Sequence, residues 1–189
     1  MKRYALMLGA VLVATTMTHA ADWPQFRGLN ADGNYTGPKL PTEWGTDKNV
    51  AWKTPIPGHG WSSPIISKGK IYLTTAVPKG EEFSLEAICL DAGKGTILWT
   101  TPLFTENSKI APKIHSKNSH ASPTPVTDGE RLYVHFGHMG PAALTLDGKI
   151  AWKNDKLKYR PVHGNGGSPI LAGDNLVFSI DGGDMQGVV

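Results

Sequence analysis

Short apolar runs alternate with glycine-containing turns and recur along the chain at a nearly fixed period. Each repeat opens on a serine-proline phrase, reaches a turn glycine within a few residues and continues in a second apolar run. The three opening phrases occupy residues 62–66, 121–126 and 167–171. A repeat of this size predicts a supersecondary unit that buries its apolar face only against neighbouring units.

The pattern predicts four short antiparallel strands in each complete repeat, because glycine supplies the positive φ that tight hairpins need. The strands of the first repeat are predicted at 62–67, 70–76, 83–90 and 96–101. Those of the second are predicted at 122–127, 131–137, 141–146 and 149–153. The third repeat offers 168–172, 175–180 and a stub at 186–189. It lacks the closing part of the other two, so we expect the sequence to be a piece of a longer protein.

The first two repeats each close on a glycine four residues ahead of a tryptophan. These pairs are Gly95 with Trp99 and Gly148 with Trp152, and Trp52 precedes both. The tryptophans are spaced by 47 and 53 residues, close to the roughly 40–50 residues of a propeller blade. Four strands with a tryptophan on the last favour radial packing over a stacked solenoid. We therefore predict an all-β fold: a β-propeller of four-stranded antiparallel blades, here an incomplete arc of about two and a half blades.

The first twenty residues have the composition of a signal peptide. Lys2 and Arg3 precede an apolar stretch at 4–14 that is too short to span a bilayer as a helix. Small residues at 18–20 suit cleavage after Ala20, which would export the chain to the periplasm or the medium; an uncleaved membrane anchor is the alternative. Without the leader, the chain has 17 basic and 16 acidic residues. This balance does not indicate nucleic-acid binding.

The repeats and the leader divide the chain into consecutive segments. They are a signal peptide at 1–20 and a partial propeller at 21–189, the latter made of an N-terminal arm at 21–58, a blade at 59–102, an insertion loop at 103–119, a blade at 120–155 and a truncated blade at 163–189. Cys89 is the single cysteine and falls in a predicted strand. It can form no internal disulfide, so we expect it to behave as a small apolar group.

One closing motif resembles that of a known family. Residues 89–99 read Cys-x-Asp-x-x-Lys-Gly-x-x-x-Trp, which is similar to the tryptophan-docking motif of β-propellers of the pyrroloquinoline-quinone (PQQ) type, Ala-x-Asp-x-x-Thr-Gly-x-x-x-Trp. Residues 142–152 match it in part, with Leu144 and Asp147 at the aspartate and threonine positions. In that family the indole packs between adjacent blades, so the resemblance implies structural docking roles for Trp52, Gly95, Trp99, Gly148 and Trp152.

The resemblance extends over residues 22–189. Segments 22–28, 49–53 and 163–169 also look like those of exported bacterial proteins that carry this propeller. The chain is thus identified as an N-terminal fragment of such a protein. The fold follows from the resemblance more directly than the activity does, because propellers host many functions.

Polar and aromatic side chains gather just ahead of the predicted inner strands. They are His59, Trp61, Asn118, His120, His163 and Asn165. Because the first strand of each blade lines the central channel, we predict that these residues surround one channel mouth as a ligand site. The alternative is that they only satisfy backbone groups where loops reach the channel.

No metal site is predicted. His135 and His138 are three residues apart, so on a strand their side chains point to opposite faces, and no carboxylate or thiol lies within four residues of them. The acidic turn at 181–184 lacks the alternating oxygen ligands of a calcium loop, and we expect a plain hairpin there. No catalytic residue is assigned either, because the chain has no nucleophile elbow.

Three functions remain open. The first is a non-catalytic exported propeller that binds another envelope protein or a small ligand, similar in kind to the propeller lipoprotein of outer-membrane barrel assembly. The second is a quinoprotein dehydrogenase for alcohols or sugars, for which the resemblance implies PQQ with calcium. Enzymes of that class carry a vicinal cysteine pair, which this sequence lacks. The third is a carbohydrate-binding propeller that uses Trp61 as a stacking surface.

Overall fold

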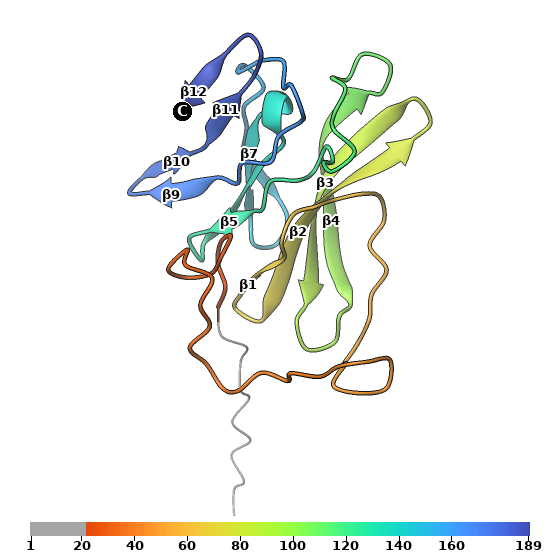
Figure 1. The fold of residues 1–189 in the computed structure, drawn as a ribbon, viewed down its shortest axis with the longest axis vertical. Coiled ribbons are helices and arrows are strands. Elements are labelled where there is room, and N and C mark those ends of the chain that lie inside the picture. The colour runs from red at the N-terminus through yellow and green to blue at the C-terminus, as the bar shows by residue number, and fades with distance from the viewer. Residues whose placement is uncertain (1–21) are drawn as a thin grey trace, which may run out of the picture.

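Antiparallel strands build nearly all of the regular structure. The computed structural model describes residues 22–189, which form two four-stranded sheets, two two-stranded ribbons and one short 3-10 helix (Figure 1). The predicted all-β fold is confirmed. The predicted signal peptide and its cleavage bond lie outside the described residues. Within 22–189 the structure contains no apolar helix of the length needed to cross a membrane.

The first sheet is a meander of consecutive strands. Its members are β1 (Ile65–Ser67), β2 (Lys70–Lys79), β3 (Glu82–Asp91) and β4 (Ile97–Asn107). The hairpin of β2 and β3 is longer than predicted, and β3 pairs with β4 as far as Glu82 opposite Asn107. Residues 103–107, expected in an insertion loop, are therefore strand, because the extended hairpin gives them a hydrogen-bonding neighbour. The loop itself begins at Ser108.

The second sheet repeats the meander with shorter strands. It consists of β5 (Val126–Thr127), β6 (Arg131–His135), β7 (Pro141–Thr145) and β8 (Ile150–Lys153), with the 3-10 helix η1 (Gly137–Met139) between β6 and β7. The predicted strand 131–137 ends at His135, because Gly137 has a φ of 59° and starts the 3-10 turn. The inner strands β1 and β5 are shorter than predicted because Pro64, Pro123 and Pro125 cannot donate to a ladder.

The third repeat forms two ribbons instead of one sheet. Strands β9 (Ile170–Ala172) and β10 (Asn175–Val177) pair with each other, as do β11 (Ser179–Asp181) and β12 (Gln186–Val188). The predicted strand 175–180 is interrupted at Phe178, whose backbone exchanges hydrogen bonds of 3.0 Å with Val189. The ribbons lie beside the second sheet in Figure 1.

The two sheets share one apolar core, and the serine-proline phrases line up beside it. The core includes Ile65, Tyr72, Leu85, Leu132 and Leu144, all fully buried. The Ser63 N–H donates to Thr124 Oγ1 at 3.0 Å, and the Thr124 N–H donates to Ser168 Oγ at 3.0 Å. The inner segments of all three repeats are therefore adjacent, as an arc of blades requires.

Tryptophan docking connects each unit to the next one along the chain. Trp52 Nε1 donates to the Ala92 carbonyl at 3.0 Å, and a Cβ at Gly95 would lie 2.3 Å from the indole. Thr54, two residues after the tryptophan, donates its hydroxyl to the Gly95 carbonyl at 2.6 Å. Only glycine fits here, because Gly95 also has a φ of 69°. The N-terminal arm thus docks on the outer turn of the first sheet.

Trp99 repeats this arrangement one unit later. Its Nε1 donates to the Leu146 carbonyl at 3.2 Å, and a Cβ at Gly148 would lie 2.7 Å from the indole. Thr101 donates its hydroxyl to the Gly148 carbonyl at 2.7 Å. Each glycine of the closing motif therefore receives the tryptophan of the preceding unit and not the tryptophan four residues after it.

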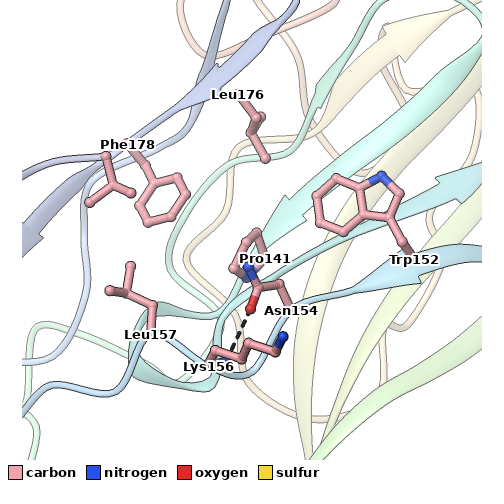
Figure 2. A pocket seen from close by; sticks show the side chains of 8 residues that line it. Pro141, Trp152, Asn154, Lys156, Leu157, Leu176 and Phe178 are labelled. Atoms are coloured by element: carbon pink, nitrogen blue, oxygen red, sulfur yellow. Dashed lines mark hydrogen bonds between the residues drawn. The ribbon is translucent and has the colours of Figure 1, made fainter.

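Trp152 is placed differently from the other two. It is 37 % exposed and borders a pocket of about 430 Å³ whose apolar wall includes Pro141, Leu157 and Phe178. Figure 2 shows the indole on one side of this pocket and Phe178 with Leu157 on the other. Among residues 22–189, no glycine turn receives this indole.

Candidate functional site

A buried carboxylate at the end of β4 joins the two sheets. The side chain of Glu106 is only 5 % exposed, and each of its oxygens meets an imidazole. Oε2 lies 2.9 Å from Nδ1 of His120, in the loop that leads into the second sheet. Oε1 lies 2.5 Å from Nε2 of His138, in η1. The His120 ring also stacks on Phe83 of β3, with ring centroids 4.7 Å apart.

The electrostatics of this cluster favour an ionised carboxylate. Burial by itself would raise the pKa of Glu106, but the hydrogen bonds and positive charge offered by His120 and His138 outweigh it and hold the pKa at about 2. The carboxylate therefore lies between two imidazoles, and its Oε1 is hydrogen-bonded to His138. His120, which we predicted to face the channel mouth, is turned toward Glu106.

A second cluster brings Asn118 and His163 together. The Asn118 amide donates to the His163 carbonyl at 3.0 Å, and the His115 N–H donates to the same oxygen at 3.1 Å. The rings of His115 and His163 meet edge to face at 6.1 Å. This cluster connects the loop before the second sheet to the loop before β9.

The other three predicted site residues have separate surroundings. Asn165 accepts a hydrogen bond from the Tyr159 hydroxyl and lies over Gly137. His59 pairs through its backbone with Ala76. The backbone N–H of Trp61 donates to the Ala121 carbonyl at 3.2 Å, and the residue is 64 % exposed.

Of the six, only Asn118 and His163 contact each other, and no aromatic or polar contact in residues 22–189 joins His59, His120 and His163. Their convergence on one ligand remains a prediction.

His135 and Cys89 are buried, and burial keeps both side chains uncharged near neutral pH. His135 is 1 % exposed, and its ring packs at a tilt against Phe178 with centroids 4.1 Å apart. Burial lowers its pKa to about 4, so the ring is neutral near pH 7. Burial raises the pKa of the Cys89 thiol to about 11. In the part of the chain that the structure describes, no three histidine, cysteine or acidic side chains are grouped so as to hold a metal ion.

Two carboxylates of the described residues are buried, and neither is free to bind calcium. Glu106 lies between two imidazoles, and Glu86 pairs with Lys79 at 3.1 Å. Binding of PQQ with calcium, which the dehydrogenase alternative implies, stays a prediction.

Glu106 was missed by sequence reasoning, because the end of its strand carries no local signal. The polar, lysine-rich composition of 102–119 suggested a loop beginning at 103. Residues 99–104 read Trp-Thr-Thr-Pro-Leu-Phe, which has no strict alternation of apolar and polar residues. The strand continues to Asn107 because β3 pairs with it, and this pairing places Glu106 near His120 and His138.

The chain matches a known protein family over most of its length. Residues 49–189 match the family described as outer membrane protein assembly factor BamB. No curated protein matches the chain. A solved structure of BamB from Moraxella catarrhalis matches with 14 % identity and a TM-score of 0.32, covering 63 % of this chain and 41 % of that one. The present chain thus spans less than half the length of that protein. Since the family match covers most of the chain, this protein belongs to the PQQ-like repeat β-propeller family of outer membrane protein assembly factor BamB.

Proposed function

We propose that this chain is an exported propeller module that works by binding another envelope protein and not by catalysis. The observation that carries the proposal is the pairing of Glu106 with two imidazoles. Its Oε2 lies 2.9 Å from His120 Nδ1 and its Oε1 lies 2.5 Å from His138 Nε2, so neither carboxylate oxygen is free to act as a general base. The family description as an assembly factor supports the same function.

The loops around this cluster are the surface we propose for binding. Loops on a rigid β-scaffold are the usual place for recognition residues. Here the scaffold is held by two tryptophan docks, and the loops are fixed by the contacts of His115, Asn118 and His163. Such fixed loops reduce the ordering cost of binding.

Site-specific crosslinking in the envelope tests this proposal. A photoreactive amino acid at exposed Ser116, in the loop before the second sheet, is expected to crosslink one discrete partner protein. The same group at exposed Asp174, in the β9–β10 turn, serves as the matched control. The captured protein, once identified and purified, should bind the chain directly.

Two further measurements accompany the crosslinking. N-terminal sequencing of the exported protein is expected to begin at Ala21, and retention of Met1 would refute export by leader cleavage. Added PQQ with calcium is expected to leave the melting temperature unchanged. A rise in melting temperature together with alcohol or sugar oxidation would contradict the proposed function in favour of the dehydrogenase.

A further inference from the structure

Two adjacent loops carry a local excess of positive charge. They are residues 108–119, before the second sheet, and residues 154–163, before β9. Their charged side chains are Lys109, Lys113, Lys117, Lys156, Lys158 and Arg160, against the one acidic residue Asp155. The rest of the chain from residue 21 onward has 11 basic and 15 acidic residues, so the positive excess belongs to this part of the surface.

The two loops form one continuous surface. The carbonyl of His163 in the second loop accepts hydrogen bonds from His115 and Asn118 in the first. Gly164 fits against Ile114, where a Cβ would lie 2.9 Å from the isoleucine methyl. These contacts hold the positive charges of both loops near each other.

Most of these charges have no partner in the described chain. Lys109 lies 2.6 Å from a Glu81 oxygen, and Arg160 lies 3.5 Å from an Asp184 oxygen. Lys113, Lys117, Lys156 and Lys158 are exposed and, among residues 22–189, have no carboxylate within 4.0 Å. Unpaired like charges repel each other and attract an anionic partner.

A hollow between the loops supplies the apolar part of the surface. It has a volume of about 320 Å³ and takes its walls from both loops and from η1. Its apolar lining consists of Ile110, Ala111, Pro112, Met139 and Tyr159. Two basic residues, Lys158 and Arg160, also line it. Glu106 and His138 also line it, and Oε1 of Glu106 lies 2.5 Å from Nε2 of His138. Ile110 is 83 % exposed at this hollow. We name the two loops and the hollow the basic cleft.

We propose that the basic cleft binds an acidic segment of the partner protein, with one apolar side chain of that segment in the hollow. This inference rests on the proposed function and specifies its partner. The lysines attract carboxylates over a distance of about 10 Å at moderate salt, and the apolar walls favour burial of a leucine-sized group. A concave pocket suits an inserted side chain better than a flat lipid surface, so we assign the cleft to a protein segment.

Fluorescence anisotropy with defined peptides tests the basic cleft. The probes are short fluorescein-labelled peptides of glutamate and glycine with a central leucine, the same peptide with glycine at the centre, and a lysine-for-glutamate control. The mature full chain is expected to bind the leucine peptide about tenfold more tightly than the glycine peptide. It should not bind the lysine control, and its affinity should fall as salt rises.

Matched variants assign the binding to these residues. Replacing Lys113, Lys117 and Lys158 by glutamate should lower the affinity for the leucine peptide by about tenfold or more. Replacing Lys39, Lys53 and Lys94 by glutamate makes the same change of net charge elsewhere and should leave the affinity unchanged. Ala111→Phe should fill the hollow and remove the advantage of leucine over glycine. All these positions except Ala111 are exposed, and circular dichroism verifies that each variant folds.

Several outcomes would overturn the basic cleft. Equal weakening by the two triple variants would show that only net charge matters. Binding to phosphatidylglycerol vesicles but to neither acidic peptide would assign the surface to lipid. If the triple variant at 113, 117 and 158 still crosslinks the partner at Ser116, the proposed function survives and the basic cleft does not.

Discussion

Replacing Trp99 by alanine should destabilise the protein far more than replacing Trp152, although both occupy the same place in their repeats. Trp99 lies on β4 and Trp152 on β8, each four residues after a turn glycine. The two residues differ in docking. The Trp99 indole packs on Gly148 and donates a hydrogen bond to the Leu146 carbonyl, whereas Trp152 has no such contact among residues 22–189 and is 37 % exposed. The pair therefore isolates the contribution of docking from that of residue type and strand position.

The expected loss for Trp99→Ala follows from its contacts. Truncating a large aromatic core residue costs about 3–5 kcal/mol, which includes the cavity left behind. The Trp99 indole is only partly buried, so we take the lower end, about 3 kcal/mol, including about 1 kcal/mol for the indole hydrogen bond. For a chain of this length, that corresponds to a decrease in melting temperature of roughly 6–12 °C. Trp152→Ala should cost less than about 1 kcal/mol.

Urea denaturation followed by far-ultraviolet circular dichroism measures both losses without relying on tryptophan emission. Trp61→Ala is a second control, because this indole is more exposed still, and it should also cost less than about 1 kcal/mol. Equal free-energy losses for Trp99→Ala and Trp152→Ala would refute the docking argument. So would a Trp99→Ala loss no larger than that of Trp61→Ala.

Three other predictions concern buried titratable groups. Glu106→Gln should lower the free energy of unfolding by about 2 kcal/mol near neutral pH, because charge-assisted contacts to His120 and His138 are lost. This loss of stability relative to wild type should shrink as pH falls from 4.5 toward 2, since the pKa of Glu106 is lowered in the native state. A pH-independent difference would contradict this. The His135 ring, with a pKa of about 4, should stay neutral in NMR titrations of the native protein down to about pH 4. The unfolded chain takes up the proton near pH 6.5, so the free energy of unfolding should decrease as pH falls from 6.5 toward 4. Titration of the native ring near pH 6.5 would contradict its burial. The Cys89 thiol, with its raised pKa, should react with a disulfide reagent only after unfolding, and complete labelling of the native protein would show it to be accessible.

The sequence predicted the repeats and their hairpins well because turn glycines and apolar alternation are local signals. Gly69 and Gly129, for example, both have positive φ in the turns where the pattern required it. The inner strands were predicted too long, because proline removes the ladder donors within an otherwise apolar phrase. The end of β4 was predicted too early, because its length depends on the hairpin of β2 and β3 beside it and not on its own composition.

The cluster of Glu106, His120 and His138 could not be derived from local signals. Glu106 and His138 are distant in sequence, and only the turn at Gly137 brings the imidazole back toward β4. His120 was identified as a residue of interest, but the direction of its side chain depends on Phe83 and Glu106 in the preceding unit. The direction of tryptophan docking was likewise hidden, because each glycine is nearest in sequence to a tryptophan that it does not receive.

The docking geometry has a consequence for how such units assemble. The tryptophan comes from one end of a repeat and its glycine turn from the next repeat, so the two joined surfaces differ. Such an interface is heterologous: a two-fold axis cannot satisfy it, and only head-to-tail addition can. A segment such as 55–101 carries the acceptor turn at Gly95, which receives the preceding tryptophan, and the donor Trp99 with Thr101, which dock on the next unit. Tandem duplication of that segment would therefore change the number of units without requiring a new interface.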